Sequence, residues 1–139
     1  MALTPHDINA YMVEAFPGGT GNRCIEVGER HAVARHEVQP DGIRPGGFVS
    51  GPTMFAMADA ALWYALFGAV GIEPMAMTSE LSIRFLRPAV GTALHGRADL
   101  HQVGRRNVVG TIVLWMDDRA DKPVAVGQGT YTRPDASRS

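Results

Sequence analysis

The chain has 139 residues, of which 45% are hydrophobic and 19% charged, a balance typical of globular proteins rather than disordered chains. Its 13 basic and 14 acidic residues give a net charge of -1, so it lacks the basic excess expected of a nucleic-acid-binding protein. Cys24 is the only cysteine, which excludes an intrachain disulfide and a multi-cysteine metal site. The length predicts a single domain over residues 1–139. The lone cysteine and the absence of a signal-peptide pattern predict a cytoplasmic protein.

The first predicted element is a short amphipathic helix. Thr4 suits the N-cap and Pro5 the first helical position, and apolar residues then recur at helical spacing. Residues 23–28 and 31–38 predict the two strands of a hairpin. Residues 39–52 are rich in glycine and proline, so we expect a loop there.

A long apolar helix is predicted over residues 53–67. The 28 residues between Arg44 and Glu73 contain a single charged residue, Asp59. A membrane-spanning helix needs about 20 apolar residues. An aspartate in the middle of such a helix is unfavourable by about 2.5–3.5 kcal/mol on insertion scales. We therefore expect a buried core helix and no membrane partner.

Residues 76–86, 94–101, 107–116 and 123–132 predict four further strands. Short connections between consecutive strands imply an antiparallel meander. A nearly all-apolar helix needs cover on most of its sides. The predicted fold class is therefore α+β, with an antiparallel sheet wrapped around one long central helix and a short N-terminal helix.

Asp59 is the main candidate for chemistry. A charged carboxylate on an apolar helix is costly unless it is paired or functional, and such surroundings suit a general base. The alternative is a structural role, as a cap or as the partner of an arginine. The turn before the helix is a second candidate, because N–H groups at a helix N-terminus can stabilise an oxyanion. Gly51 precedes Asp59 by eight residues, about 12 Å of helical rise, so the two can flank one substrate or act across a subunit interface.

Four segments resemble, in order and spacing, hotdog-fold acyl-CoA thioesterases of the PaaI-like group, in the 4-hydroxybenzoyl-CoA thioesterase superfamily. These segments are residues 44–53, 58–61, 84–89 and 103–106, and the closing residues 124–131 are similar too. The resemblance spans about residues 31–132 and implies the same sheet around a central helix. It also implies homodimers or homotetramers with active sites between subunits.

The resemblance implies hydrolysis of an acyl-CoA to a free acid and coenzyme A, with no metal and no cofactor. Asp59 matches the helix acid that activates or orients the attacking water, or that attacks as a nucleophile. Gly51 matches the glycine whose N–H polarises the thioester carbonyl, and Thr78 a Ser/Thr position on a neighbouring subunit that helps to place the water. Further substrate contacts are expected from the turn, the helix start and the arginines at strand ends, which suit phosphate. These residues are Phe48, Ser50, Pro52, Thr53, Met54, Phe85, Arg87, Arg105 and Arg106.

The chain departs from the family pattern at two places. Ser50-Gly51-Pro52 stands where the family usually has His-Gly-Gly, and residues 42–45 lack the family's asparagine. Pro52 has no N–H, so the oxyanion donors are limited to Gly51, Thr53 and the Ser50 hydroxyl. A non-catalytic binder of acyl-CoA or another hydrophobic ligand is therefore the second hypothesis. A dehydratase or hydratase is the third and is disfavoured, because no histidine lies in the loop or on the central helix.

Overall fold

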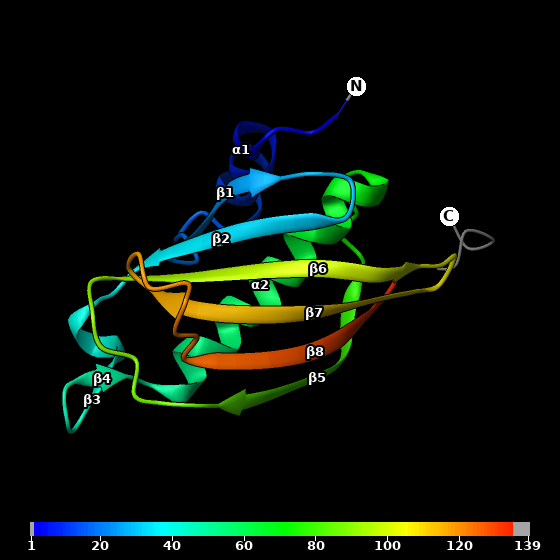
Figure 1. Cartoon of the computed structure of the whole chain (residues 1–139). Coiled ribbons are helices and arrows are strands. Elements are labelled where there is room, and N and C mark those ends of the chain that lie inside the picture. Colours follow the sequence, from blue (N-terminus) through cyan, green and yellow to red (C-terminus); the bar gives the residue numbers. More distant parts are fainter. Residues whose placement is uncertain (1, 135–139) are drawn as a thin grey trace.

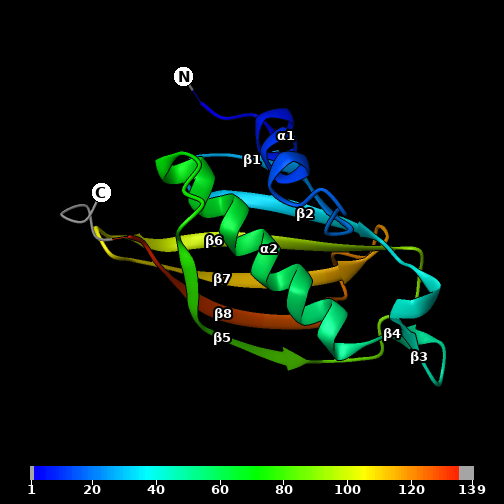
Figure 2. The ribbon, with the colours of Figure 1, turned by 180° about the vertical axis from the view of Figure 1, so that it is seen from behind.

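The structure is a computed structural model that describes residues 2–134. A six-stranded antiparallel sheet has the order β1-β2-β6-β7-β8-β5, and the long helix α2 (Gly51–Val70) lies across one face of it (Figures 1 and 2). The strands are β1 (Asn22–Val27), β2 (His31–Glu37), β5 (Met77–Phe85), β6 (Ala93–Val103), β7 (Asn107–Met116) and β8 (Ala125–Thr132). The predicted α+β fold, a sheet around one long helix with a short N-terminal helix, is confirmed.

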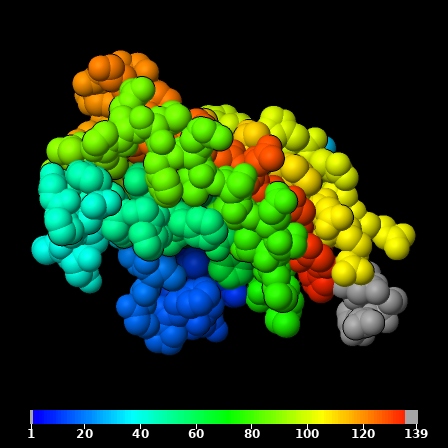
Figure 3. All heavy atoms as spheres, turned by 90° about the horizontal axis from the view of Figure 1, so that it is seen from below, coloured from blue at the N-terminus to red at the C-terminus, as the bar shows by residue number. Residues whose placement is uncertain are grey.

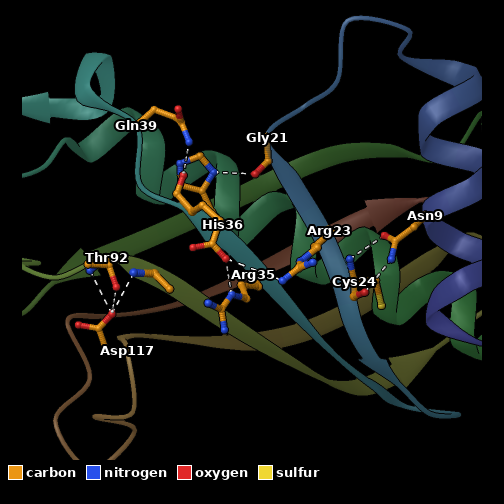
Figure 4. A network of polar contacts seen from close by, with 11 residues as sticks. Asn9, Gly21, Arg23, Cys24, Arg35, His36, Gln39, Thr92 and Asp117 are labelled. Carbon is orange, nitrogen blue, oxygen red and sulfur yellow. Dashed lines mark hydrogen bonds and ion pairs between the residues drawn. The ribbon is translucent and has the colours of Figure 1, made fainter.

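Helix α1 (Pro5–Ala15) begins with the predicted cap. The Thr4 hydroxyl accepts from the Asp7 N–H at 3.2 Å, and the Asp7 carboxylate accepts from the Thr4 N–H at 2.9 Å. The side chain of Asn9 then joins α1 to the edge strand β1. It donates to the carbonyl of Cys24 and accepts from the N–H of Cys24, both at 2.8 Å (Figure 4). Because β1 is an edge strand of the described sheet, the outward-facing N–H and C=O of Cys24 have no neighbouring strand, and the side chain of Asn9 satisfies them instead.

The predicted loop over residues 39–52 is partly regular. It contains the 3-10 turn η1 (Pro40–Gly42) and a small hairpin of β3 (Ile43–Arg44) and β4 (Phe48–Val49). Gly46 and Gly47 form its tip with φ of 107° and 83°, values that favour glycine. Two-residue strands are too short to produce a periodic hydrophobic pattern, so the sequence could not reveal them.

Helix α2 begins before and ends after its predicted limits. Gly68, which was expected to break the helix, lies within it. The β1–β2 turn lies so close that a Cβ at this position would clash with the carbonyl oxygen of Gly28, so the position requires glycine. Gly71, with φ of 93°, then ends the helix. By length and composition alone α2 resembles a membrane span, but nine of its residues are buried in the core, as expected of a core helix.

The predicted meander is wrong for β5. Strands β6, β7 and β8 do follow one another as hairpins, but β5 pairs with β8 at the edge of the sheet and β6 pairs with β2 at its centre. Seven of the nine residues of β5 are exposed, as is usual for an edge strand. Alternating hydrophobicity shows which face a strand buries but does not show its neighbour, so the strand order was not accessible from the sequence.

Glycines on the inner face of the sheet let α2 approach it closely. Cβ atoms at Gly110 and Gly129 would each lie 2.9 Å from a methyl carbon of Leu62, and one at Gly96 would lie 3.1 Å from Cγ of Met57. Side chains of α2 therefore occupy the space that larger residues on the strands would fill. This close packing brings the middle of α2 within hydrogen-bonding distance of side chains on β5 and β8.

Candidate active site

Asp59 lies in the middle of α2 and is partly exposed. Its Oδ1 accepts two hydrogen bonds, from the hydroxyl of Thr78 at 2.6 Å and from the hydroxyl of Tyr131 at 2.7 Å. Within residues 2–134 no hydrogen bond or ion pair reaches Oδ2, and no arginine pairs with the carboxylate. The protein thus holds one oxygen of Asp59 and leaves the other available to a ligand or to water.

The sheet register explains why both hydroxyls reach the same oxygen. Thr78 on β5 and Tyr131 on β8 are direct partners across the antiparallel pair, so their side chains point to the same face of the sheet, toward α2. The register shifts between Thr78 and Glu80, an irregularity of the kind that re-aims side chains next to functional sites. Thr78 was expected to act from a neighbouring subunit, and within this single chain it already contacts the chain's own Asp59.

Tyr131 was not among the candidates found from the sequence. Only 3% of its surface is exposed, and its ring stacks on that of Trp63 with centroids 6.4 Å apart. Burial, and secondarily the charge of Asp59, raise the pKa of Tyr131, so its hydroxyl stays protonated and remains a donor. The alternation of the last predicted strand shows that Tyr131 faces inward, but only the register shows that it lies opposite Thr78.

The N-terminus of α2 leaves one free backbone donor among the candidates. Ser50 is the N-cap, and its hydroxyl accepts from the Thr53 N–H at 3.4 Å and lies 2.9 Å from the Thr53 hydroxyl. Pro52 has no N–H. Within the described residues no hydrogen bond uses the N–H of Gly51, the first residue of the helix. Of the backbone donors considered above, Gly51 is therefore the one able to stabilise an oxyanion.

A pocket of about 380 Å³ opens beside Gly51. Five of the predicted substrate-contacting or catalytic residues line it: Phe48, Gly51, Met54, Phe85 and Arg87. Arg44, which was not among the predicted site residues, also lines it, and its guanidinium lies 4.8 Å from the centre of the Phe48 ring. The pocket therefore combines apolar walls with two arginine side chains.

Arg105 and Arg106 lie away from this pocket, in the turn between β6 and β7. Arg106 donates to the carbonyl of Arg133 at 3.2 Å, and Arg133 forms an ion pair of 2.6 Å with Glu73, just beyond the C-terminus of α2. The pocket lies at the other end of this 20-residue helix, which is about 30 Å long. One chain therefore does not bring these two arginines to the pocket. In the described part of the chain, no group of three or more His, Cys, Asp or Glu residues is arranged to hold a metal ion.

Comparison with known proteins identifies the class. The family model described as the thioesterase superfamily matches residues 46–122, more than half of the chain, and the protein belongs to this family. A solved structure from Silicibacter sp. TM1040, described as that of a candidate thioesterase, is 34% identical and has a TM-score of 0.85. The match covers 96% of this chain and 93% of that one. No curated protein matches the sequence.

More distant structures share the fold. A thioesterase from Haemophilus influenzae is 18% identical, with a TM-score of 0.82 over 97% of this chain and 93% of that one. A mutant of the phenylacetic acid degradation protein PaaI from Thermus thermophilus is 23% identical, with a TM-score of 0.69 over 88% of this chain and 97% of that one. The resemblance to hotdog-fold, PaaI-like thioesterases is confirmed, and thioester hydrolysis is the general reaction that family membership supports.

Proposed function

We propose that the protein hydrolyses an acyl-CoA thioester to a free acid and coenzyme A, at sites shared between copies of a single-domain chain. The observation that supports this most directly is the Asp59 carboxylate, whose Oδ1 is held by two hydroxyls while its Oδ2 has no hydrogen-bond partner in the described part of the chain. In a member of the thioesterase superfamily, a carboxylate presented in this way suits proton transfer from water.

In the proposed reaction Asp59 Oδ2 takes a proton from water while the water oxygen attacks the thioester carbonyl carbon. The Thr78 hydroxyl donates its hydrogen bond to Asp59 Oδ1, so its oxygen lone pairs remain able to accept a hydrogen bond from the second O–H of that water and to orient it. The N–H of Gly51 donates to the carbonyl oxygen as negative charge develops there. The carbon–sulfur bond then breaks, and the proton on Asp59 passes to the departing sulfur of coenzyme A.

A second copy of the chain is needed to complete the site. Gly51 and Asp59 are eight residues apart on one helix, about 12 Å along its axis, too far for one thioester group to contact both. We therefore assign Gly51 and Asp59 of one site to different copies, as a homodimer or homotetramer provides. We propose that Arg105 and Arg106 of one copy contact the coenzyme A phosphates held at the pocket of another.

The edge of the sheet at β5 supports such an assembly. Around this edge large apolar side chains are exposed, which are Met75 (71%), Met77 (67%), Phe85 (49%), Leu86 (43%) and Val90 (65%). In Figure 3 the start of α2 (teal) lies beside β5 and beside the segment that follows β5 (light green) on one surface of the molecule. An edge strand with exposed apolar residues is suited to pairing with another chain. A cytoplasmic setting, in which the buried Cys24 thiol stays reduced, fits this proposal.

The first test is the release of free thiol from short, medium, long and aromatic acyl-CoAs. We expect turnover by the wild type and a loss of at least about 100-fold in kcat for Asp59→Asn, because the amide cannot take the proton from water. Asp118→Asn, an exposed residue in the β7–β8 turn, is the matched control and should retain full activity. Full activity of Asp59→Asn would show that Asp59 is not the base.

The same reaction run for a single turnover in H2(18)O separates the two roles of Asp59. A general base puts the label only into the product acid, whereas attack by the carboxylate leaves it in the Asp59 side chain. We expect the label in the product, because Asp59 is held in place by two donors and is partly exposed.

The second candidate function, binding of acyl-CoA without hydrolysis, is favoured by one observation. Pro52 has no N–H and the Thr53 N–H is used by Ser50, so the helix start offers a single backbone donor to an oxyanion. Saturable binding of acyl-CoA by calorimetry, with no thiol release from any member of the panel, would establish this function instead.

A further inference from the structure

We infer that Tyr131 is a positioning residue for the hydrolysis proposed above, on which this inference rests. With Thr78 it fixes Oδ1 of Asp59, so that Oδ2 is the oxygen that receives the proton from water.

The Tyr131 hydroxyl contacts two parts of the same residue. It lies 2.7 Å from the carboxylate Oδ1 of Asp59 and 3.3 Å from the backbone carbonyl oxygen of Asp59. A donor that bridges the side chain and the backbone of one residue restricts the rotation of that side chain about its Cα–Cβ and Cβ–Cγ bonds. Oδ2 therefore keeps one direction relative to the axis of α2.

Tyr131 is the better anchored of the two donors. Thr78 is exposed and lies on the edge strand β5, which pairs with β8 alone. Tyr131 lies on β8, which pairs with both β5 and β7, and its ring is buried against Trp63. The threonine hydroxyl is shared between Asp59 and water in the proposed reaction, whereas the buried Tyr131 hydroxyl has Asp59 as its hydrogen-bond partner. Loss of Tyr131 would leave the carboxylate held by an exposed side chain on an edge strand.

Tyr131 is buried, with 3% of its surface exposed, and its hydroxyl donates to Asp59, so it contacts the proposed base and not the expected substrate. A group of this kind affects the chemical step more than binding of the substrate. Its removal should therefore lower kcat and leave KM nearly unchanged. Removal of a residue that only supports the core would change the stability of the protein without lowering kcat selectively over KM.

The test compares Tyr131→Phe with the wild type. The substitution keeps the ring and removes the hydroxyl, and we expect kcat to fall about 10- to 100-fold with KM within about twofold, because a misdirected base reacts poorly. Tyr64→Phe is the matched control. Tyr64 is also fully buried and its hydroxyl makes no hydrogen bond to Asp59 within residues 2–134. Urea unfolding of each variant shows that it is folded at the assay temperature.

Proton NMR of the same samples measures the hydrogen bond without relying on turnover. The proton that the buried Tyr131 hydroxyl donates to the carboxylate is expected far downfield, whereas the proton of the exposed Thr78 hydroxyl exchanges with water. The Tyr131 signal should be absent in Tyr131→Phe and move upfield in Asp59→Asn. If the wild type hydrolyses acyl-CoA and Tyr131→Phe has an unchanged kcat, the role of Tyr131 is overturned and the proposed function stands. The inference also fails if Tyr64→Phe loses as much kcat, or if the downfield proton is missing. A wild type that hydrolyses no acyl-CoA would overturn the proposed function itself and, with it, the role of Tyr131.

Discussion

The backbone N–H of Gly51 is the proposed oxyanion donor. Its position at the start of α2 allows a proline substitution to remove this N–H with little other change to the helix. Gly51 is the first residue of α2, where proline is well tolerated. The preceding Ser50 has φ of -70° and ψ of 153°, the extended conformation that a following proline requires. We expect Gly51→Pro to fold and to lower kcat about 100-fold, as removal of one oxyanion donor does in other hydrolases.

Gly51→Ala is the matched control for that variant, because it adds a side chain but keeps the N–H. Its Cβ would lie 3.5 Å from the Phe85 ring, an ordinary van der Waals distance. Thiol release by the two variants, measured with the same acyl-CoA, should therefore differ strongly. Equal loss in both would assign the effect to the altered pocket wall and would contradict the role of the N–H.

At the scale of elements, α1 is expected to stabilise the edge of the sheet through Asn9. Replacing Asn9 by alanine leaves the N–H and the carbonyl of Cys24 without these partners, next to a buried side chain. We expect Asn9→Ala to lower the free energy of unfolding by about 1–3 kcal/mol, the usual cost of unsatisfied backbone groups. The measurement is the midpoint of urea unfolding with an unchanged m-value.

Glu14→Ala provides the comparison on the same helix. Glu14 is exposed and makes no ion pair within the described residues, so its replacement should change stability by less than about 0.5 kcal/mol. If the two variants proved equally stable, the Asn9 contacts would contribute nothing measurable to the attachment of α1.

The elements themselves were largely accessible from the sequence, because each has a local cause. Thr4 and Pro5 mark the start of α1, and the apolar run around Asp59 marks α2. The same run made Asp59 conspicuous as a charge in apolar surroundings. The position of β5 and the hydrogen bond from Tyr131 depend instead on which strands pair and in which register. Those are long-range properties that hydrophobic periodicity does not encode, so the donors around Asp59 became visible only in the folded chain.

At the scale of the whole molecule, one chain separates the two groups that the proposed reaction needs together. The middle of α2 carries the proposed base with its two hydroxyl donors, and the start of α2 carries the pocket and the Gly51 N–H, which no hydrogen bond uses within residues 2–134. The segments in and around β5 that carry exposed apolar residues lie on the same surface as the start of α2 (Figure 3). We propose that a closed, symmetric pair buries this surface and places the start of one α2 near the middle of the other. The assembly would then form two sites, each taking one part from each chain.

Mixing two inactive variants tests this arrangement. Gly51→Pro lacks the donor and Asp59→Asn lacks the base, so each forms sites with one defect. In a mixed pair, one site combines the intact Gly51 of one chain with the intact Asp59 of the other, and the second site carries both defects. Random exchange of subunits in an equal mixture should therefore restore about a quarter of the wild-type activity, since about half of the pairs are mixed and each has one intact site of two. The measurement is thiol release before and after exchange in mild denaturant, with each variant exchanged against itself as the control. If both groups acted from the same chain, every site in the mixture would keep one defect, and no activity would return.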